Sequence, residues 1–131
     1  MKCLRIRIIF LILIYLLVQA MLNWDFKDAV WGPYPVAGTA TWYTAAITST
    51  GEYLDGNSLT CAMRKKDYGK YYRVCSRDNG KCVVVRHNNF GPRKSLFRQG
   101  RIIDLSCRAF LELADLETGI INVTVSEEEF K

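Results

Sequence analysis

The stretch VVVRHNNFGPRKSLFRQGRIIDLS, residues 83–106, decides how the rest of the chain is interpreted. It begins as an apolar β-forming run, breaks at Gly91-Pro92, crosses a basic segment and returns to an apolar run at Ile102-Ile103. Turn residues between two apolar runs predict two strands joined by a loop. Asp104, the only carboxylate between Asp78 and Glu112, follows the second run. It is therefore either an N-terminal helix cap or a catalytic acid.

The remaining pattern predicts a small all-β domain. Short β-forming runs separated by turn residues predict six strands, at residues 40–47, 59–63, 71–75, 82–86, 101–105 and 120–125. Ser106 is the predicted cap of one helix, which carries Cys107, Phe110, Leu111 and Ala114 on one face and ends at Gly119. Because a single sheet of this size leaves exposed edges, we expect a closed or partly closed β-barrel.

The N-terminus has the outline of a secretory signal peptide. Lys2, Arg5 and Arg7 precede an unbroken apolar run over residues 8–18, and Val18-Gln19-Ala20 offers small residues at the cleavage spacing. We expect a signal peptide at residues 1–20. The alternative is an uncleaved anchor helix, and we expect membrane association only in that case. A linker at 21–37, the barrel at 38–125 and an acidic tail at 126–131 complete the division. The expected location is secreted, periplasmic or cell-envelope.

Charge and cysteine content narrow the class of protein. Residues 64–108 hold thirteen Lys and Arg against three Asp, which favours an anionic partner or a solvated basic surface. No zinc spacing, helix-turn-helix pattern or RNA-binding consensus is present, so we expect no nucleic acid, metal or cofactor. Four cysteines follow residue 20, an even number that predicts two disulfides in an exported chain. Of the three connectivities, the preferred one joins Cys75 to Cys82 across the loop at 77–80, and Cys61 to Cys107.

Five motifs resemble the rare lipoprotein A-like double-psi β-barrel family in order and spacing: ATWY (40–43), SLTCAM (58–63), YG (68–69), CVVVRHNNFGP (82–92) and GRIIDLS (100–106). Septal lytic transglycosylases, expansins and barwin-like proteins share this fold, and the resemblance covers residues 38–125. It implies a six-stranded double-psi β-barrel with one short α-helix, a monomer with a groove for β-linked polysaccharide. In the transglycosylase branch the substrate is peptidoglycan glycan, which is cleaved without water.

The chain departs from the transglycosylase pattern at two positions. Met63 stands where that branch has histidine, and Asn89 stands where it has aspartate. Asp104 matches the essential acid of expansins, so the resemblance makes it the candidate catalytic residue. The candidate substrate-binding residues are Tyr43, Thr60, Met63, Arg86, His87, Asn89 and Arg101.

Three functions remain open at this point. The first is a peptidoglycan-binding protein of the lytic transglycosylase type, with cleavage of glycan strands weakened or lost. The second is an expansin-like module that binds glycan without cleaving it. The third is a disulfide-stabilised secreted interaction protein that keeps only the scaffold.

Overall fold

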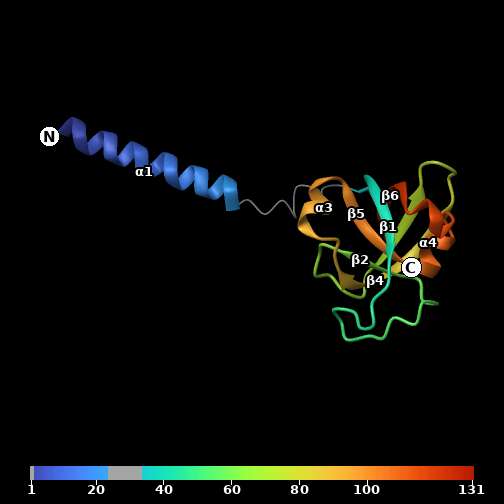
Figure 1. The fold of residues 1–131 in the computed structure, drawn as a ribbon. Coiled ribbons are helices and arrows are strands. Elements are labelled where there is room, and N and C mark those ends of the chain that lie inside the picture. Colours follow the sequence, from blue (N-terminus) through green and yellow to red (C-terminus); the bar gives the residue numbers. More distant parts are fainter. Residues whose placement is uncertain (1, 24–33) are drawn as a thin grey trace. The chain divides into compact units, whose positions relative to one another are not determined.

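The computed structural model describes residues 2–23 and 34–131, which form a helix and a β-barrel (Figure 1). The helix α1 (Lys2–Asn23) contains nearly all of the predicted signal peptide. Within the two described ranges, no helix is both long and apolar enough to cross a membrane. Most of the predicted linker lies outside the described residues.

Six strands close into a barrel in the spatial order β1-β5-β2-β4-β3-β6, with β6 returning to β1. The pairs β1/β5 and β2/β4 are parallel, and the other neighbours are antiparallel. The strand bounds are β1 (Val36–Tyr43), β2 (Thr60–Met63), β3 (Tyr71–Ser76), β4 (Cys82–Phe90), β5 (Arg101–Ser106) and β6 (Ile120–Glu128). The prediction of a six-stranded barrel is confirmed.

Three strands differ from their sequence prediction by three or more residues. β4, expected to end at Arg86, continues through Phe90. β1 begins and ends four residues earlier than expected, and Gly38 lets its first half approach β5 closely. A Cβ atom at Gly38 would lie 2.7 Å from the carbonyl oxygen of Gly100. β6 continues through Glu128, three residues into the segment expected as an acidic tail. There it pairs with β3, and Lys70 and Arg73 form ion pairs with Glu127 and Glu128.

The helical segments are shorter and more numerous than expected. The helix after Ser106 stops as α4 (Cys107–Leu111), and a separate 3-10 helix η1 (Leu116–Thr118) precedes Gly119. Phe110 and Leu113 are buried but Leu111 is exposed, so the predicted apolar face is wrong in part. The basic segment, expected as a loop, contains α3 (Lys94–Arg98), which buries Phe97.

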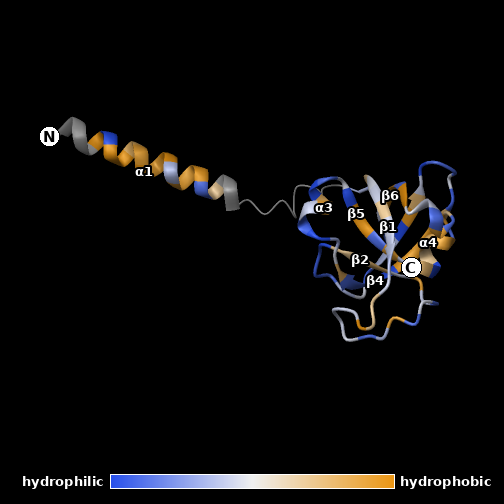
Figure 2. Ribbon diagram, viewed as in Figure 1, coloured by the Kyte–Doolittle hydropathy of each residue, from blue (hydrophilic) through white to orange (hydrophobic). Residues whose placement is uncertain are grey.

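Alternating side chains fill the barrel. In β3 and β6 every second residue is buried, and the fully buried set includes Val74, Val85, Leu105, Val123 and Val125. Branched side chains fit this pleated and enclosed surface. Figure 2 shows hydrophobic residues along the barrel strands and along much of α1.

The predicted disulfide between Cys75 and Cys82 is confirmed, with an S–S distance of 2.06 Å. The two residues are direct partners in β3 and β4, and Ser76 donates to the carbonyl of Lys81, so the loop spans residues 77–80 as expected. The predicted bond between Cys61 and Cys107 is wrong, and both thiols are free. Cys61 is paired with Leu105, whereas Cys107 lies two residues further on, where α4 turns away from the sheet.

Candidate functional site

A row of four paired residues crosses four neighbouring strands. Asp104 of β5 is paired with Thr41 of β1 on one side and with Ala62 of β2 on the other, and Ala62 is in turn paired with Asn89 of β4. Paired residues in a sheet project to the same face, so these side chains lie on one face of the sheet. Thr41, Ala62 and Asp104 are largely buried there, and Asn89 is partly exposed. Asp104 and Asn89 are two strands apart, a separation of about 10 Å. Gly91 lies beside the row, since a Cβ atom there would be 3.6 Å from Ala62 Cβ and 3.7 Å from Asp104 Oδ2.

Asp104 is part of a strand and does not cap a helix. Its Oδ1 atom accepts hydrogen bonds from Arg101 Nε (2.6 Å) and Thr41 Oγ1 (2.9 Å). Its Oδ2 atom accepts no hydrogen bond from any other residue within 2–23 or 34–131. Ser106 caps α4 instead, because its side chain accepts from the backbone N–H of Ala109. One oxygen of Asp104 is therefore held in place, and the other remains available as an acceptor.

Asn89, at the other end of the row, has its amide oxygen fully engaged. Asn89 Oδ1 accepts from the backbone N–H of Ser49 (2.9 Å), from Ser49 Oγ (2.7 Å) and from the backbone N–H of Phe90 (3.0 Å). These bonds fix the orientation of the amide and connect β4 to the long loop between β1 and β2. An amide cannot ionise at any accessible pH, so Asn89 offers hydrogen bonds and no acid.

Tyr43, at the end of β1, lies close to both ends of the row. Burial raises the pKa of its phenol to about 12, and the nearby Asn89 amide opposes that shift. Cys61 and the negative charges of Asp104 and Glu52 contribute smaller parts of the same upward shift of the pKa. The hydroxyl is buried and, within the described part of the chain, lacks a partner at hydrogen-bond geometry. It is therefore a neutral donor at physiological pH.

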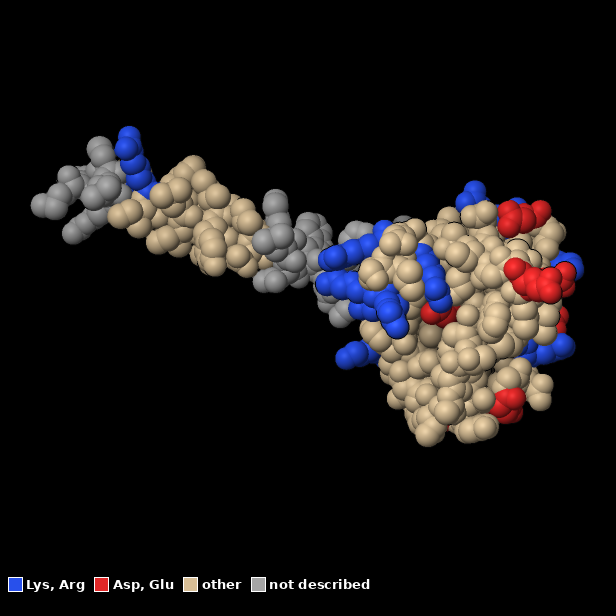
Figure 3. All heavy atoms as spheres, in the orientation of Figure 1, with Lys and Arg blue, Asp and Glu red and all other residues tan. Residues whose placement is uncertain are grey.

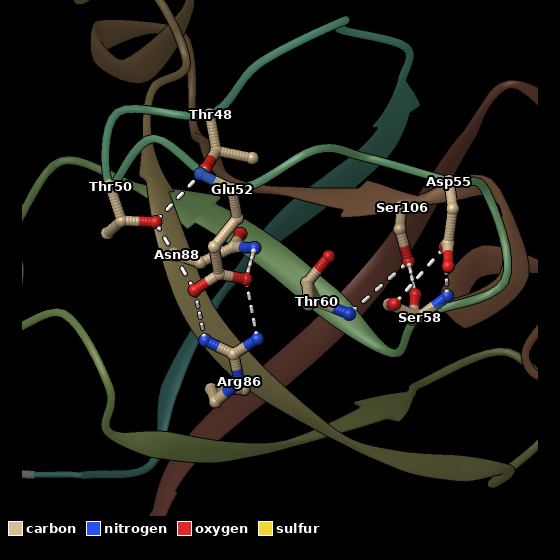
Figure 4. A network of polar contacts seen from close by, with 9 residues as sticks. All are labelled: Thr48, Thr50, Glu52, Asp55, Ser58, Thr60, Arg86, Asn88 and Ser106. Atoms are coloured by element: carbon tan, nitrogen blue, oxygen red, sulfur yellow. Dashed lines mark hydrogen bonds and ion pairs between the residues drawn. The ribbon is translucent and has the colours of Figure 1, made fainter.

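Arg86 does not face the row as a free cation, because it binds the loop between β1 and β2. Its two terminal nitrogens each donate to Glu52 at 2.7 Å, and Asn88 donates to the same carboxylate at 3.1 Å (Figure 4). The hydrogen bonds from Arg86, followed by that from Asn88, lower the pKa of Glu52 to about 2. The candidate substrate-binding residue Arg86 thus has a structural partner that lies 34 residues away in sequence.

His87 is fully buried and supports the site from behind. Its Nδ1 atom lies 2.7 Å from Asp67 Oδ1, and its Nε2 atom lies 2.8 Å from the backbone oxygen of Asn89. Because both partners are acceptors, both bonds form together only when each ring nitrogen carries a proton. Burial raises the pKa of Asp67, but hydrogen bonds from Tyr72, Lys65 and His87 outweigh burial and lower it.

The structure brings together four of the eight candidate residues. Asp104, Arg101, Asn89 and Tyr43 meet at the row or beside it. Thr60 and Met63 are buried, at 2% and 0% exposure, as is His87, and Arg86 is held by Glu52.

Sequence reasoning missed Thr41, Ser49, Glu52 and Asp67. Thr41 carried a signal, because it lies inside the quoted ATWY motif, two residues before Tyr43. The other three have partners 20 to 40 residues away, and no local pattern marks them.

Basic side chains gather on the part of the barrel that carries α3 (Figure 3). Arg93, Lys94 and Arg98 are exposed there. Arg64 packs its guanidinium 4.9 Å from the centre of the Phe90 ring and donates to the carbonyl of Pro92. Arg64 therefore contacts the end of β4 and the residue that follows Gly91.

Comparison of the sequence with known proteins identifies a family to which the chain is similar. Residues 35–125 match a family model described as lytic transglycolase. An endolytic peptidoglycan transglycosylase RlpA from Vibrio cholerae is 39% identical over 93 residues, which are 68% of this chain and 34% of that protein. A Pseudomonas aeruginosa protein of the same description is 40% identical over 96 residues, 70% of this chain and 27% of that protein. The chain thus spans about a third or less of these relatives.

Solved structures share the fold at low sequence identity. The Streptomyces papain inhibitor superposes with a TM-score of 0.60 at 22% identity, covering 73% of this chain and 96% of that one. A mutant Clavibacter michiganensis expansin in complex with cellohexaose gives a TM-score of 0.54 at 20% identity, covering 71% and 50% of the two chains. These neighbours agree with the double-psi barrel expected from the sequence motifs.

Proposed function

The chain belongs to the lytic transglycolase family of double-psi β-barrels, and from that membership we propose that its barrel binds the glycan strands of peptidoglycan. Relatives at about 40% identity are named as peptidoglycan transglycosylases, and a structural neighbour is an expansin bound to cellohexaose. Peptidoglycan strands and cellohexaose are both β-linked glycans, which supports a β-linked glycan as the class of ligand. The row from Thr41 to Asn89 is the proposed binding surface.

The row can supply polar contacts to a sugar. Asp104 Oδ2 is free to accept a hydrogen bond from a hydroxyl or acetamide N–H group, while Arg101 and Thr41 fix the carboxylate through Oδ1. The Tyr43 hydroxyl is a neutral donor. A few polar groups at fixed positions are what orient a ligand in a binding site.

We propose further that cleavage of the glycan is weak or absent. The single observation that supports this is that Asn89 is an amide whose oxygen already accepts three hydrogen bonds. Cleavage without water requires a group that protonates the leaving oxygen and then accepts a proton from the attacking hydroxyl. Asn89 cannot do either, because its oxygen already accepts three hydrogen bonds and its amide does not ionise. Met63, the other replaced position, has no titratable group.

Weak lyase activity is the second candidate function. It is favoured by the proximity of Asp104, a carboxylate with one free oxygen, to the protonated phenol of Tyr43. Such a pair could share the roles of base and acid. An interaction protein that keeps only the scaffold is the third candidate, and no contact among the described residues favours it.

The proposed location is outside the cytoplasm. The disulfide between Cys75 and Cys82 is stable in oxidising compartments, where peptidoglycan also lies. Residues 1–20 would direct export as a cleaved signal.

Incubation of the full chain with purified sacculi tests the proposal. We expect the protein to co-sediment with sacculi and to release few or no anhydro-muropeptides, as measured by mass spectrometry. Asp104→Asn should weaken co-sedimentation, because the free carboxylate oxygen is replaced in part by an amide. Asp78→Asn, which changes an exposed carboxylate on the β3–β4 loop, is the matched control and should bind normally.

Two results would count against the proposal. Absence of co-sedimentation would remove glycan binding and favour the interaction protein. Abundant anhydro-muropeptides that disappear in Asp104→Asn would make the protein a lyase and overturn the argument from Asn89.

A further inference from the structure

A small hairpin at residues 46–54 lies within the long loop between β1 and β2. Thr48 donates its backbone N–H to the carbonyl of Glu52 (2.9 Å), and Gly51 donates to the carbonyl of Thr48 (2.9 Å). Gly51 has φ of +84°, the left-handed conformation that a three-residue hairpin loop requires at this position. The loop is therefore locally ordered rather than irregular along its whole length.

The polar face of this hairpin is attached to the barrel. Thr48 is only 5% exposed, and Glu52 forms the two-pronged ion pair with Arg86 of β4 (Figure 4). At the hairpin tip, Ser49 donates to Asn89 of the row through both its backbone N–H and its hydroxyl. These contacts fix the position of the hairpin at the Asn89 end of the row.

The apolar face of the hairpin points into solvent. Ile47 and Tyr53 form a bridged pair and are 66% and 76% exposed. Their positions alternate with those of Thr48 and Glu52, so they project from the opposite face. The pair occurs between two hydrogen-bonded pairs, where side chains across a hairpin approach most closely. Folding alone favours the reverse arrangement, with the apolar face packed on the barrel.

We propose that Ile47 and Tyr53 form a platform for the apolar face of a sugar ring, extending the glycan-binding row beyond Asn89. This inference rests on the proposed function. The choice of a glycan as the occupant follows from continuity, because Ser49 of the same hairpin contacts Asn89 of the row. An aromatic ring beside an aliphatic side chain provides flat apolar area, and a tyrosine contributes it with little loss of side-chain freedom. The ion pair between Glu52 and Arg86 holds the platform in place before the ligand binds.

Titration of the full chain with glycan oligosaccharides released from sacculi, followed by calorimetry, tests the platform. Tyr53→Ala should lower the affinity about fivefold, the usual effect of losing one aromatic contact. Tyr53→Phe should keep the wild-type affinity, because the ring and not the hydroxyl makes the contact. Phe130→Ala is the matched control, since Phe130 is a similarly exposed aromatic (69%) near the C-terminus and should bind as wild type does.

Each other outcome has a definite meaning. If Tyr53→Ala binds glycan as wild type does while Asp104→Asn binds more weakly, the platform is overturned and the proposed function stands. If wild type does not bind glycan at all, the proposed function fails and the platform fails with it. If Tyr53→Ala abolishes a concentration-dependent dimer without changing glycan affinity, the patch contacts a second copy of the chain and the platform is overturned.

Discussion

Asp104 and Ser106 lie on the same face of β5 and have different roles. The sequence left helix capping open as a role for Asp104, but Ser106 is the residue that caps α4. Asp104 accepts hydrogen bonds from Arg101 and Thr41 within the sheet, whereas Ser106 caps α4. The Ser106 hydroxyl also donates to the carbonyl of Ser58 (2.6 Å) and accepts from the backbone N–H of Thr60 (3.3 Å). Ser106 is a structural residue, whereas Asp104 is the residue that we propose contacts the glycan through Oδ2.

Ser106→Ala should lower the free energy of unfolding by about 2 kcal/mol, because it removes a helix cap and leaves buried backbone groups unpaired. Urea unfolding followed by circular dichroism measures this change. Ser95→Ala in α3, where the serine is exposed, is the control and should change the free energy by less than about 0.5 kcal/mol. A similarly small effect for Ser106→Ala would contradict the capping role.

At the scale of elements, the loop between β1 and β2 depends on β4. Arg86 and Asn88 of β4 hold Glu52, and Asn89 holds Ser49. His87 alternates with Arg86 and contacts Asp67 on the other side of the strand. The register shift between Cys61 and Ala62 in the β2/β4 pairing places Asn89 on the side opposite to His87. β4 therefore positions the hairpin on one face and the buried imidazole on the other, which makes it the central element of the site.

Glu52 should make stability depend on pH in the acidic range. Its folded pKa of about 2 lies below the ordinary value of 4.5, so the ion pair contributes fully above pH 4.5 and is lost as pH falls toward 2. Because the carboxylate is 39% exposed, solvent screening limits this contribution to about 1 kcal/mol. Urea unfolding of wild type and Glu52→Gln at pH 6 and pH 2.5 measures it.

The free energies of unfolding of wild type and Glu52→Gln should differ at pH 6, and the difference should become much smaller at pH 2.5. Glu129→Gln, which changes an exposed glutamate beyond the end of β6, should keep the wild-type pH dependence. If Glu52→Gln unfolds as wild type does at pH 6, the ion pair does not stabilise the loop.

At the scale of the whole molecule, closure of the barrel gives every strand two neighbours. β6 closes it by pairing with β1 through Val36–Thr41 and with β3 through Tyr71–Ser76. Closure removes the exposed edges that otherwise allow strands of different molecules to pair. The residues after Val125 contribute to this closure, since Ser126, Glu127 and Glu128 pair with β3.

Deletion of residues 126–131 should destabilise the barrel and promote aggregation, because it leaves the first half of β3 paired with β4 alone and exposes its other edge. Deletion of Glu129–Lys131, which leaves β6 complete, is the matched control. Thermal unfolding with light scattering distinguishes them, and we expect a lower melting temperature and more scattering for the longer deletion only. Equal melting temperatures for both deletions would show that the end of β6 does not help to close the barrel.

Much of this fold was predictable from local sequence. Short β-forming or apolar runs between turn residues marked the six strands, and the seven-residue spacing of Cys75 and Cys82 allowed their disulfide. Short helices were less predictable, because α3 is fixed by Phe97 packing into the core rather than by a repeated apolar pattern. The prediction of a second disulfide failed because it depended on tertiary structure. The register of β2 against β5 places Cys61 opposite Leu105 and not opposite Cys107.

The sequence by itself determined the barrel and the identity of Asp104 and Asn89 as an acid and an amide, because periodicity and motifs are carried by neighbouring residues. Only the tertiary structure decided which side chains meet. The alignment of Thr41, Asp104 and Ala62 with Asn89 follows from the registers of three strand pairs. The ion pair between Glu52 and Arg86 and the contact between His87 and Asp67 join segments 34 and 20 residues apart. Those registers depend on closure of the whole barrel, which no local stretch encodes.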